Sequence, residues 1–242
     1  MQVQRKPPKI AYLIPNFFTS GSIFSGVFSI AYAIEGHYVL ASWMIFVALL
    51  FDGLDGRMAR LTRTTSSFGV EFDSLADIVS FGVAPAILVY QFAGHNFGRL
   101  GIVVAALYIT FGAIRLARFN IMNATTEPSV FIGIPIPTAA VVLSVLVLLY
   151  EKYALGGGFY IVLLVVMMGV SLLMVSNIRY PSFKKMDALS IHYMRAFVLL
   201  ALCGSLVLLY PIEGLALLFM VYLLYGPFRA IYTIYTRHRL MR

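Results

Sequence analysis

The chain has 242 residues, of which 61% are hydrophobic and 12% are charged, and its formal net charge is +8. Soluble domains carry about 25% charged residues, so this composition excludes an ordinary soluble globular protein. The mean hydropathy of +0.90 instead predicts an integral membrane protein in which lipid covers most of the apolar surface. The single cysteine, Cys203, excludes a disulfide framework.

Apolar runs follow one another along the chain, joined by short connections rich in Gly, Pro and polar residues. A membrane-spanning helix needs about 20 residues, and about eight spans are predicted on this basis. We therefore expect an all-α, polytopic membrane helix bundle that forms a single domain over residues 1–242. The predicted spans are 14–34, 38–51 with a helical continuation to about residue 60, 68–92, 100–121, 132–150, 159–177, 195–210 and 212–232.

The basic residues are distributed unevenly between the two sides of this predicted bundle. An even number of spans places both termini on one side, and that side holds all of the 18 Lys and Arg residues except Arg99 and Lys152. Basic residues accumulate on the cytoplasmic side of membrane proteins, so both termini are predicted to be cytoplasmic. Because topology accounts for the positive charge, we expect membrane lipids, and no nucleic acid, as partners.

Acidic residues cluster where the second predicted span ends and the third begins. Asp52 and Asp55 are three residues apart and share one helical face, and Asp73 and Asp77, four residues apart, share another. The linker of residues 61–67 turns the chain back, so the two pairs can face each other across a hairpin of residues 52–77. An ordinary charged loop would explain Arg63 but would not explain four aspartates on matched faces.

Converging carboxylates need a positive partner, because they repel one another when they are charged. This number of hard oxygen ligands suits Mg²⁺, Mn²⁺ or Ca²⁺, and two facing pairs suit two divalent cations. No Cys/His cluster accompanies them, which argues against zinc. Arg57, Arg60 and Arg63 add positive charge beside this predicted metal site, as a phosphate-binding site would require.

The pattern D-x2-D-G-x2-A-R-x8-G-x3-D-x3-D, which runs from Asp52 to Asp77, resembles the signature of the CDP-alcohol phosphatidyltransferase family. The resemblance implies an enzyme that transfers a phosphatidyl group from CDP-diacylglycerol to an alcohol, and it implies a homodimer. By the same resemblance Asp52, Asp55, Asp73 and Asp77 bind metal, and Asp77 is also the general base. The resemblance further implies contacts to CDP-diacylglycerol from Gly56, Ala59, Arg60, Ser66 and Gly69, and from Asn16 and Thr19 of a first-helix motif, although Asn16 also suits a helix cap.

The acceptor alcohol is predicted from two motifs later in the chain. Arg115 and Arg118 share a helical face, with Asn120 close by, and two arginines can clamp a carboxylate or a phosphate. They can equally be topology signals that reach toward lipid headgroups. The runs RLARFN and GIPIP resemble those of the serine-using branch of the family, which implies L-serine as acceptor, phosphatidylserine and CMP as products, and Arg115, Arg118 and Asn120 as serine contacts.

Two alternatives to serine transfer are compatible with these residues. Arginine binds phosphate as readily as carboxylate, so glycerol 3-phosphate or inositol phosphate could be the acceptor. A cation transporter could use the aspartates as its ion path, but transporters usually place acids near the bilayer midplane.

We expect a multi-pass protein of the cytoplasmic membrane with its active site facing the cytoplasm. The extra helices at about 195–232 carry no recognisable chemical motif.

Overall fold

The computed structural model describes residues 13–123, 130–181 and 193–240. Within these ranges seven helices are long and apolar enough to cross a membrane, which makes the chain a multi-pass membrane protein. The prediction of a helical membrane protein is thus confirmed. The predicted span at 195–210 forms a shorter apolar helix of 17 residues, Tyr193–Leu209.

The chain divides into two compact units, Met1–Ile109 and Thr110–Arg242. The long helix α5 carries the chain from the first unit into the second. The described helices of the first unit are α1 (Leu13–Ile34), α2 (Tyr38–Leu61), α3 (Ser67–Asp77), the π-helix η2 (Ile78–Val83), α4 (Ala84–Phe92), the 3₁₀ helix η3 (Gly94–Phe97) and the first part of α5 (Arg99–Asn123).

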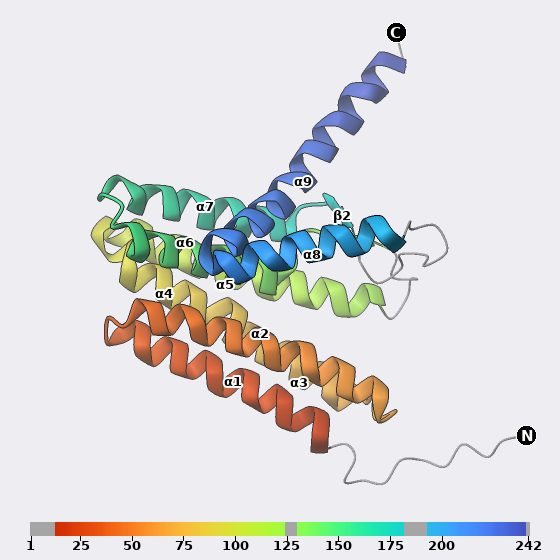
Figure 1. Ribbon diagram of the computed structural model, residues 1–242. Coiled ribbons are helices and arrows are strands. Elements are labelled where there is room, and N and C mark those ends of the chain that lie inside the picture. The colour runs from red at the N-terminus through yellow and green to blue at the C-terminus, as the bar shows by residue number, and fades with distance from the viewer. Residues whose placement is uncertain (1–12, 124–129, 182–192, 241–242) are drawn as a thin grey trace, which may run out of the picture. The chain divides into compact units, whose positions relative to one another are not determined.

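Helices α1 and α2 lie side by side in the first unit (Figure 1). The buried face of α1 consists mostly of small residues, including Ser22, Gly26 and Ser29. Ser29 donates a hydrogen bond of 2.8 Å to the carbonyl of Ala41 on α2. Small residues and interhelical hydrogen bonds let membrane helices approach closely, so this face brings α1 against the helices that carry the acidic residues.

A π-helix interrupts the third predicted span directly after Asp77. Side-chain hydrogen bonds join it to its neighbours. Ser80 donates to the carbonyl of Ser22 at 2.8 Å and accepts from the Ser22 hydroxyl at 3.2 Å, and Tyr108 donates to the carbonyl of Phe81 at 3.0 Å. A side chain on Gly26 would place its Cβ 2.8 Å from the Cα of Ser80, so this glycine permits the close approach. Short π-helical segments often occur at functional sites.

The second unit combines helices with a short two-stranded ribbon. Strand β1 (Val130–Ile132) pairs antiparallel with β2 (Arg179–Pro181), and Phe131 lies opposite Tyr180. The sequence did not predict this ribbon. The other described elements are the second part of α5, α6 (Ile136–Tyr153), α7 (Gly158–Val175), α8 (Tyr193–Leu209) and α9 (Pro211–Leu240).

The fifth membrane helix begins at Ile136, a few residues after the approximate start that was predicted at residue 132. Gly133 has a φ of 76°, a left-handed conformation that glycine adopts without strain. Pro135 follows in an extended conformation as the N-cap of α6. The first residues of GIPIP therefore form the turn before the helix, and its second proline, Pro137, lies in the first turn, where a proline is tolerated.

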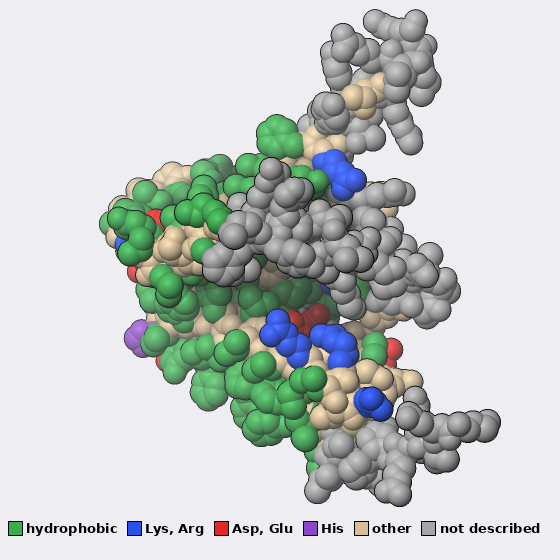
Figure 2. All heavy atoms as spheres, turned by 45° about the vertical axis from the view of Figure 1, so that its right-hand side comes forward, with side chains coloured by type: hydrophobic (Ala, Val, Ile, Leu, Met, Phe, Trp, Pro, Cys, Tyr) green, Lys and Arg blue, Asp and Glu red, His purple; other side chains and the backbone are tan. Residues whose placement is uncertain are grey.

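Large apolar side chains remain exposed on the outer faces of the helices, as expected for surfaces in contact with lipid. On α1 they include Phe17, Phe24 and Phe28, which are 70%, 67% and 52% exposed. Figure 2 shows hydrophobic side chains covering much of the surface formed by α1 and α2, with Lys and Arg side chains gathered toward one end. That charge distribution agrees with a helix hairpin whose polar end lies at a membrane surface.

Candidate active site

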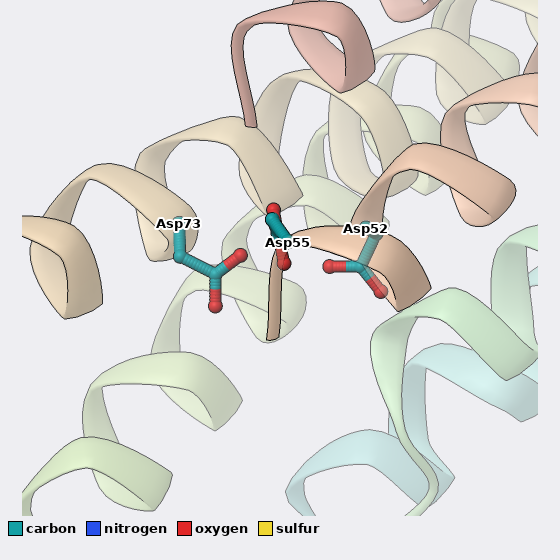
Figure 3. A group of neighbouring side chains, drawn as sticks. All are labelled: Asp52, Asp55 and Asp73. Carbon is teal, nitrogen blue, oxygen red and sulfur yellow. The ribbon is translucent and has the colours of Figure 1, made fainter. Parts of the chain in front are cut away.

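The aspartates converge from two helices of the first unit. Asp52 and Asp55 lie on the last turns of α2, and Asp73 lies on α3. One carboxylate oxygen from each of the three lies within 4.8 Å of the others. Figure 3 shows their side chains directed into one common space. The α2–α3 hairpin therefore brings the two halves of the acidic pattern together.

Three charged carboxylates at this separation are electrostatically unfavourable on their own. At an effective dielectric of about 20, two unit charges about 5 Å apart repel by about 3 kcal/mol. Asp73 Oδ1 is buried and has no hydrogen-bond partner among the described residues. An oxygen-only donor set with such an atom fits a hard divalent cation, and the three carboxylates can hold one.

Asp77 lies one turn after Asp73, at the end of α3 and directly before the π-helix. It is 9% exposed, and its side chain is within hydrogen-bonding distance of Asp52. It thus lies at the edge of the three-aspartate group rather than within it. This position keeps a carboxylate close to the cluster while leaving it outside the set of three converging oxygens.

Thr19 joins α1 to the acidic cluster. Its hydroxyl donates a hydrogen bond of 2.9 Å to Asp55 Oδ2, and it also lies 3.2 Å from the carbonyl oxygen of Pro15 on its own helix. Thr19 and Asp55 are only 3% and 6% exposed. The family resemblance predicted Thr19 as a nucleotide contact; in the structure its hydroxyl also orients a carboxylate of the cluster.

A cleft opens beside the cluster, between α1, the end of α2 and the start of α3. Its empty space is about 590 Å³, which includes open solvent at the mouth. Every residue that was predicted to contact CDP-diacylglycerol lines this cleft. The full lining is Pro15, Asn16, Thr19, Asp55, Gly56, Ala59, Arg60, Thr64, Thr65, Ser66, Gly69, Val70 and Asp73.

Ser66 shapes the far wall of the cleft as the N-cap of α3. Its hydroxyl accepts a hydrogen bond of 3.1 Å from the backbone N–H of Gly69. A side chain on Gly69 would place its Cβ 3.3 Å from this hydroxyl and 3.9 Å from Asn16 Oδ1, so the glycine keeps the wall open. Such caps typically contribute about 1 kcal/mol to the stability of a helix.

Two threonines of the cleft were not predicted from the sequence. Thr64 is 3% exposed, and its hydroxyl lies 2.6 Å from that of Thr62. Thr65, its exposed neighbour, also lines the cleft. Both lie in the linker between the two halves of the acidic pattern. From the sequence we predicted only that this linker turns the chain back.

The residues predicted to bind serine lie in the second unit, on α5. Arg115 is 6% exposed, and its guanidinium carbon lies 5.1 Å from the ring centre of Phe119. Asn120 follows Phe119 on the same helix and is half-buried. The buried guanidinium of Arg115 is therefore held against an aromatic ring instead of extending into solvent.

Arg118 binds the C-terminal end of α7. It donates hydrogen bonds of 3.2–3.4 Å to the carbonyls of Met174, Val175 and Ser176 and to Asn177 Oδ1. The last carbonyls of a helix have no partner within the helix, and arginine in this position satisfies them. The two arginines of the RLARFN run thus have different surroundings.

The chain is similar in sequence to a known protein family and to several of its members. The sequence profile of the CDP-alcohol phosphatidyltransferase family matches residues 12–226. The chain is 52% identical to a CDP-diacylglycerol–serine O-phosphatidyltransferase of Helicobacter pylori over 91% of this chain and 92% of that protein. It is 37% identical to the enzyme of that name from Mycobacterium leprae, over 89% and 74% of the two chains. It is 38% identical to an archaetidylserine synthase of Methanothermobacter thermautotrophicus, over 72% of each.

The fold and the site define a multi-pass membrane protein with an acidic cluster that can hold a metal ion beside a polar cleft. The family match extends over nearly the whole described chain. The chain belongs to the CDP-alcohol phosphatidyltransferase family.

Proposed function

We propose that this protein transfers the phosphatidyl group of CDP-diacylglycerol to the hydroxyl of L-serine, producing phosphatidylserine and CMP. The observation that carries the proposal is the cleft beside Asp55 and Asp73, which gathers every predicted nucleotide contact in one place. The names of similar proteins from two bacteria, which share up to 52% of their residues with this chain, support serine as the acceptor.

The cleft binds the CDP portion of the lipid substrate in this proposal. Gly56, Ala59 and Gly69 present little side-chain bulk, so a flat base and a diphosphate can approach the backbone. Arg60 lies in the last turn of α2. One of its terminal guanidinium nitrogens is 3.6 Å from the position that a Cβ on Gly56 would occupy. Its guanidinium can pair with the diphosphate. Arginine suits this role better than lysine, because its planar group can bind phosphate oxygens through two nitrogens at once.

Asp52, Asp55, Asp73 and Asp77 hold two divalent cations, Mg²⁺, Mn²⁺ or Ca²⁺, in the proposed site. The convergence of three of these carboxylates and the orphaned oxygen of Asp73 support this assignment. When bound, such cations neutralise negative charge on the diphosphate and on the departing CMP. The chain itself contributes positioning and a fixed electrostatic environment, which supply most of the rate in phosphoryl transfer.

Asp77 acts as the general base. Its carboxylate accepts the proton of the serine hydroxyl while the hydroxyl oxygen forms a bond to the phosphorus of the phosphatidyl group. The bond from that phosphorus to the bridging oxygen breaks, and CMP leaves with the bonding electrons. Direct displacement is preferred, since the sequence offers no Ser or His that is obviously poised as a nucleophile.

Arg115, Arg118 and Asn120 recognise serine in this proposal, with an arginine paired to the serine carboxylate. Arg115 is the stronger candidate of the two arginines. The guanidinium of Arg118 donates to the carbonyls at the end of α7, so its contribution is to fix the position of that helix end near the proposed serine contacts. Arg115 is buried, and a carboxylate that reaches it would be well shielded from water.

The proposal also covers the domain organisation of the enzyme, its membrane topology and its location. Both units form a single domain with eight spans, both termini lie in the cytoplasm, and the active site faces the cytoplasm of a cell membrane. The charge distribution along the sequence supports this orientation, and the match of one family profile to residues 12–226 supports the single domain. The family resemblance also supports a homodimer.

Release of CMP by the purified protein tests this function. Protein in detergent, supplied with CDP-diacylglycerol and serine, should release CMP only when Mg²⁺ or Mn²⁺ is present. A protein that only transports cations would release none. Cation-dependent CMP release therefore separates the proposed transferase from an ion-transporting protein, and its absence under all cation conditions would exclude the proposal.

A further inference from the structure

The linker between α2 and α3 places a buried hydroxyl in the wall of the cleft. The N–H of Thr64 donates to the carbonyl of Ala59 at 3.0 Å, as in a Schellman motif at the end of a helix. The N–H of Arg63 donates to the carbonyl of Arg60 at 3.3 Å, which completes the motif. Arg63 has a φ of 52°, the left-handed conformation that this motif requires. The chain therefore turns here, and Thr64, only 3% exposed, becomes part of the cleft wall.

The hydrogen bonds of Thr62 determine how the Thr64 hydroxyl can bond. The Thr62 hydroxyl lies 2.7 Å from the carbonyl oxygen of Met58, which can only accept, so Thr62 donates its one proton there. The hydroxyl oxygens of Thr62 and Thr64 are 2.6 Å apart. Because the proton of Thr62 is already used, Thr64 is the donor in this second bond. The Thr64 oxygen then has no proton left for a ligand and presents only lone pairs to the cleft.

A hydroxyl that can only accept discriminates between the groups of a nucleotide. Phosphate oxygens and the carbonyl oxygens of a base are acceptors themselves, so they form no hydrogen bond with the Thr64 oxygen. The donors of a cytidine nucleotide are the exocyclic amino group of cytosine and the hydroxyls of the ribose. Uracil has a carbonyl oxygen in the place of that amino group. An acceptor at this edge of the base therefore favours cytosine over uracil.

Two features of the threonine pair favour the amino group over a ribose hydroxyl. A ribose hydroxyl both donates and accepts, so it can pair with a threonine in either orientation and gains nothing from a fixed proton. The amino group only donates, so it requires a partner that accepts. Thr64 is also shielded from water, and a buried acceptor that faces a second acceptor is costly, because neither oxygen regains a hydrogen bond. A fixed bond direction and burial are together the properties that discrimination between two bases needs.

We propose that Thr64 determines the base specificity of the cleft by accepting a hydrogen bond from the amino group of cytosine, and that Thr62 sets the direction of this bond by accepting the Thr64 proton. Thr62 does not line the cleft itself, so it acts through Thr64. The inference rests on the proposed function, because it takes the nucleotide of CDP-diacylglycerol as the ligand of the cleft. It assigns roles to two residues outside the acidic pattern and outside the contacts that the family resemblance implied.

Equilibrium binding of free nucleotides tests the assignment without an acceptor alcohol and without turnover. Purified protein in detergent is titrated with CDP, UDP and 2′-deoxy-CDP in the presence of Mn²⁺, and calorimetry gives the three dissociation constants. Wild type should bind CDP at least about tenfold more tightly than UDP, since a uracil carbonyl opposite Thr64 leaves two buried acceptors without a donor. The titration with 2′-deoxy-CDP shows whether a substitution at Thr64 affects recognition of the ribose instead of the base.

Isosteric substitutions separate the roles of the two threonines. Thr64→Val removes the acceptor and keeps the shape, so it should weaken CDP binding about three- to tenfold and leave UDP binding within about twofold of wild type. Thr64→Ser should keep the wild-type preference. Thr62→Val lets the Thr64 hydroxyl turn its proton toward the cleft and donate to the uracil carbonyl. This variant should therefore bind UDP at least about threefold more tightly than wild type does, with CDP binding within about twofold.

Ser67→Ala is the control for these variants. Ser67 is a hydroxyl residue of the same segment, but it is exposed and does not line the cleft. The substitution should leave all three dissociation constants unchanged.

Equal affinity of wild type for CDP and UDP would overturn the assignment. So would a Thr64→Val protein that loses affinity for both nucleotides equally, because the contact would then be to groups that CDP and UDP share. If this variant changes the preference for CDP over 2′-deoxy-CDP but not that for CDP over UDP, Thr64 contacts the ribose and the base contact is excluded. Unchanged UDP binding in Thr62→Val excludes the proton-directing role of Thr62.

Failure of the proposed function would give a different result. A wild-type protein that binds no nucleotide refutes that function, and with it the role of the cleft. Selective binding of CDP by a protein that is inactive with serine refutes only serine as the acceptor and leaves the base assignment standing.

Discussion

The Thr19 hydroxyl lies 2.9 Å from Asp55 Oδ2, and this hydrogen bond links the first membrane helix to the carboxylates at the end of the second. A carboxylate that binds a cation must present a particular oxygen in a particular direction. A hydrogen bond to one oxygen restricts the rotation of the group and directs the other oxygen toward the cluster. Helix α1 therefore contributes both to the wall of the cleft and to the orientation of a proposed metal ligand.

Thr19→Val should weaken metal binding more than nucleotide binding. Valine has nearly the same shape but no hydroxyl, and loss of such a supporting hydrogen bond typically lowers metal affinity by about 10- to 100-fold. Titration of the purified protein with Mn²⁺, followed by electron paramagnetic resonance, measures the affinity without catalysis. Thr19→Ser should remain close to wild type. A raised KM for CDP-diacylglycerol with unchanged Mn²⁺ affinity would show instead that Thr19 contacts the nucleotide.

Asp52→Asn and Asp73→Asn should each abolish CMP release while the protein remains folded and extractable. Each change removes one charged ligand from a group whose oxygens lie within 4.8 Å of one another. Glu71→Gln is the matched control, since Glu71 is an exposed carboxylate on the same helix as Asp73. Chelation should inactivate wild type, and added Mn²⁺ or Mg²⁺ should restore it. Activity of either Asn variant in the presence of chelator would refute the metal site.

The two arginines of α5 should respond differently to substitution by alanine. Arg115→Ala should lower kcat/KM for serine about 10- to 150-fold, because a charge-assisted pair in a shielded pocket contributes about 1.5–3 kcal/mol. Arg118→Ala should also lower the thermal unfolding midpoint, since it leaves carbonyls at the end of α7 without their donor. Equal unfolding midpoints for the two variants would contradict a capping role for Arg118.

Cysteine labelling tests the predicted orientation in the membrane. In a Cys203→Ser background, a cysteine replacing Ser67 should react with a membrane-impermeant maleimide only from the cytoplasmic side. A cysteine replacing Gly156 should react only from the opposite side, and nothing described lies within 4 Å of a side chain at that position to hinder it. Ser67 is exposed at the start of α3 and does not line the cleft. The reverse labelling pattern would show that the topology is opposite to the predicted one.

The local spacing of residues was enough to predict the acidic hairpin. Residues three and four apart share a helical face, so Asp52 with Asp55 and Asp73 with Asp77 could be assigned to common surfaces from the sequence alone. Asp77 lies beside Asp52 at the edge of the cluster, and its role as a metal ligand and general base stays a prediction. A π-helix begins directly after it, and its residues, Ile78–Val83, carry no sequence signal that distinguishes them from an α-helix.

Contacts between distant segments could not be predicted from one sequence. The partners of Arg118 are backbone carbonyls of α7, and any helix end offers the same carbonyls whatever its sequence. Tyr180 and Leu223 are 43 residues apart, and only the fold shows that the Tyr180 hydroxyl donates to the Leu223 carbonyl. That carbonyl has no helical donor, because Pro227, four residues later in α9, lacks an N–H. The proline itself was visible in the sequence, but the tyrosine that compensates for it was not.

Competition between acceptors tests the proposed function most directly. Purified protein with CDP-diacylglycerol and Mn²⁺ is offered radiolabelled serine, glycerol 3-phosphate and inositol phosphate in parallel, and the labelled lipid products are separated. We expect labelled phosphatidylserine in amounts equal to the CMP released, and little or no lipid product from the two phosphorylated acceptors. Efficient transfer to glycerol 3-phosphate or inositol phosphate, with serine inactive, would contradict serine transfer.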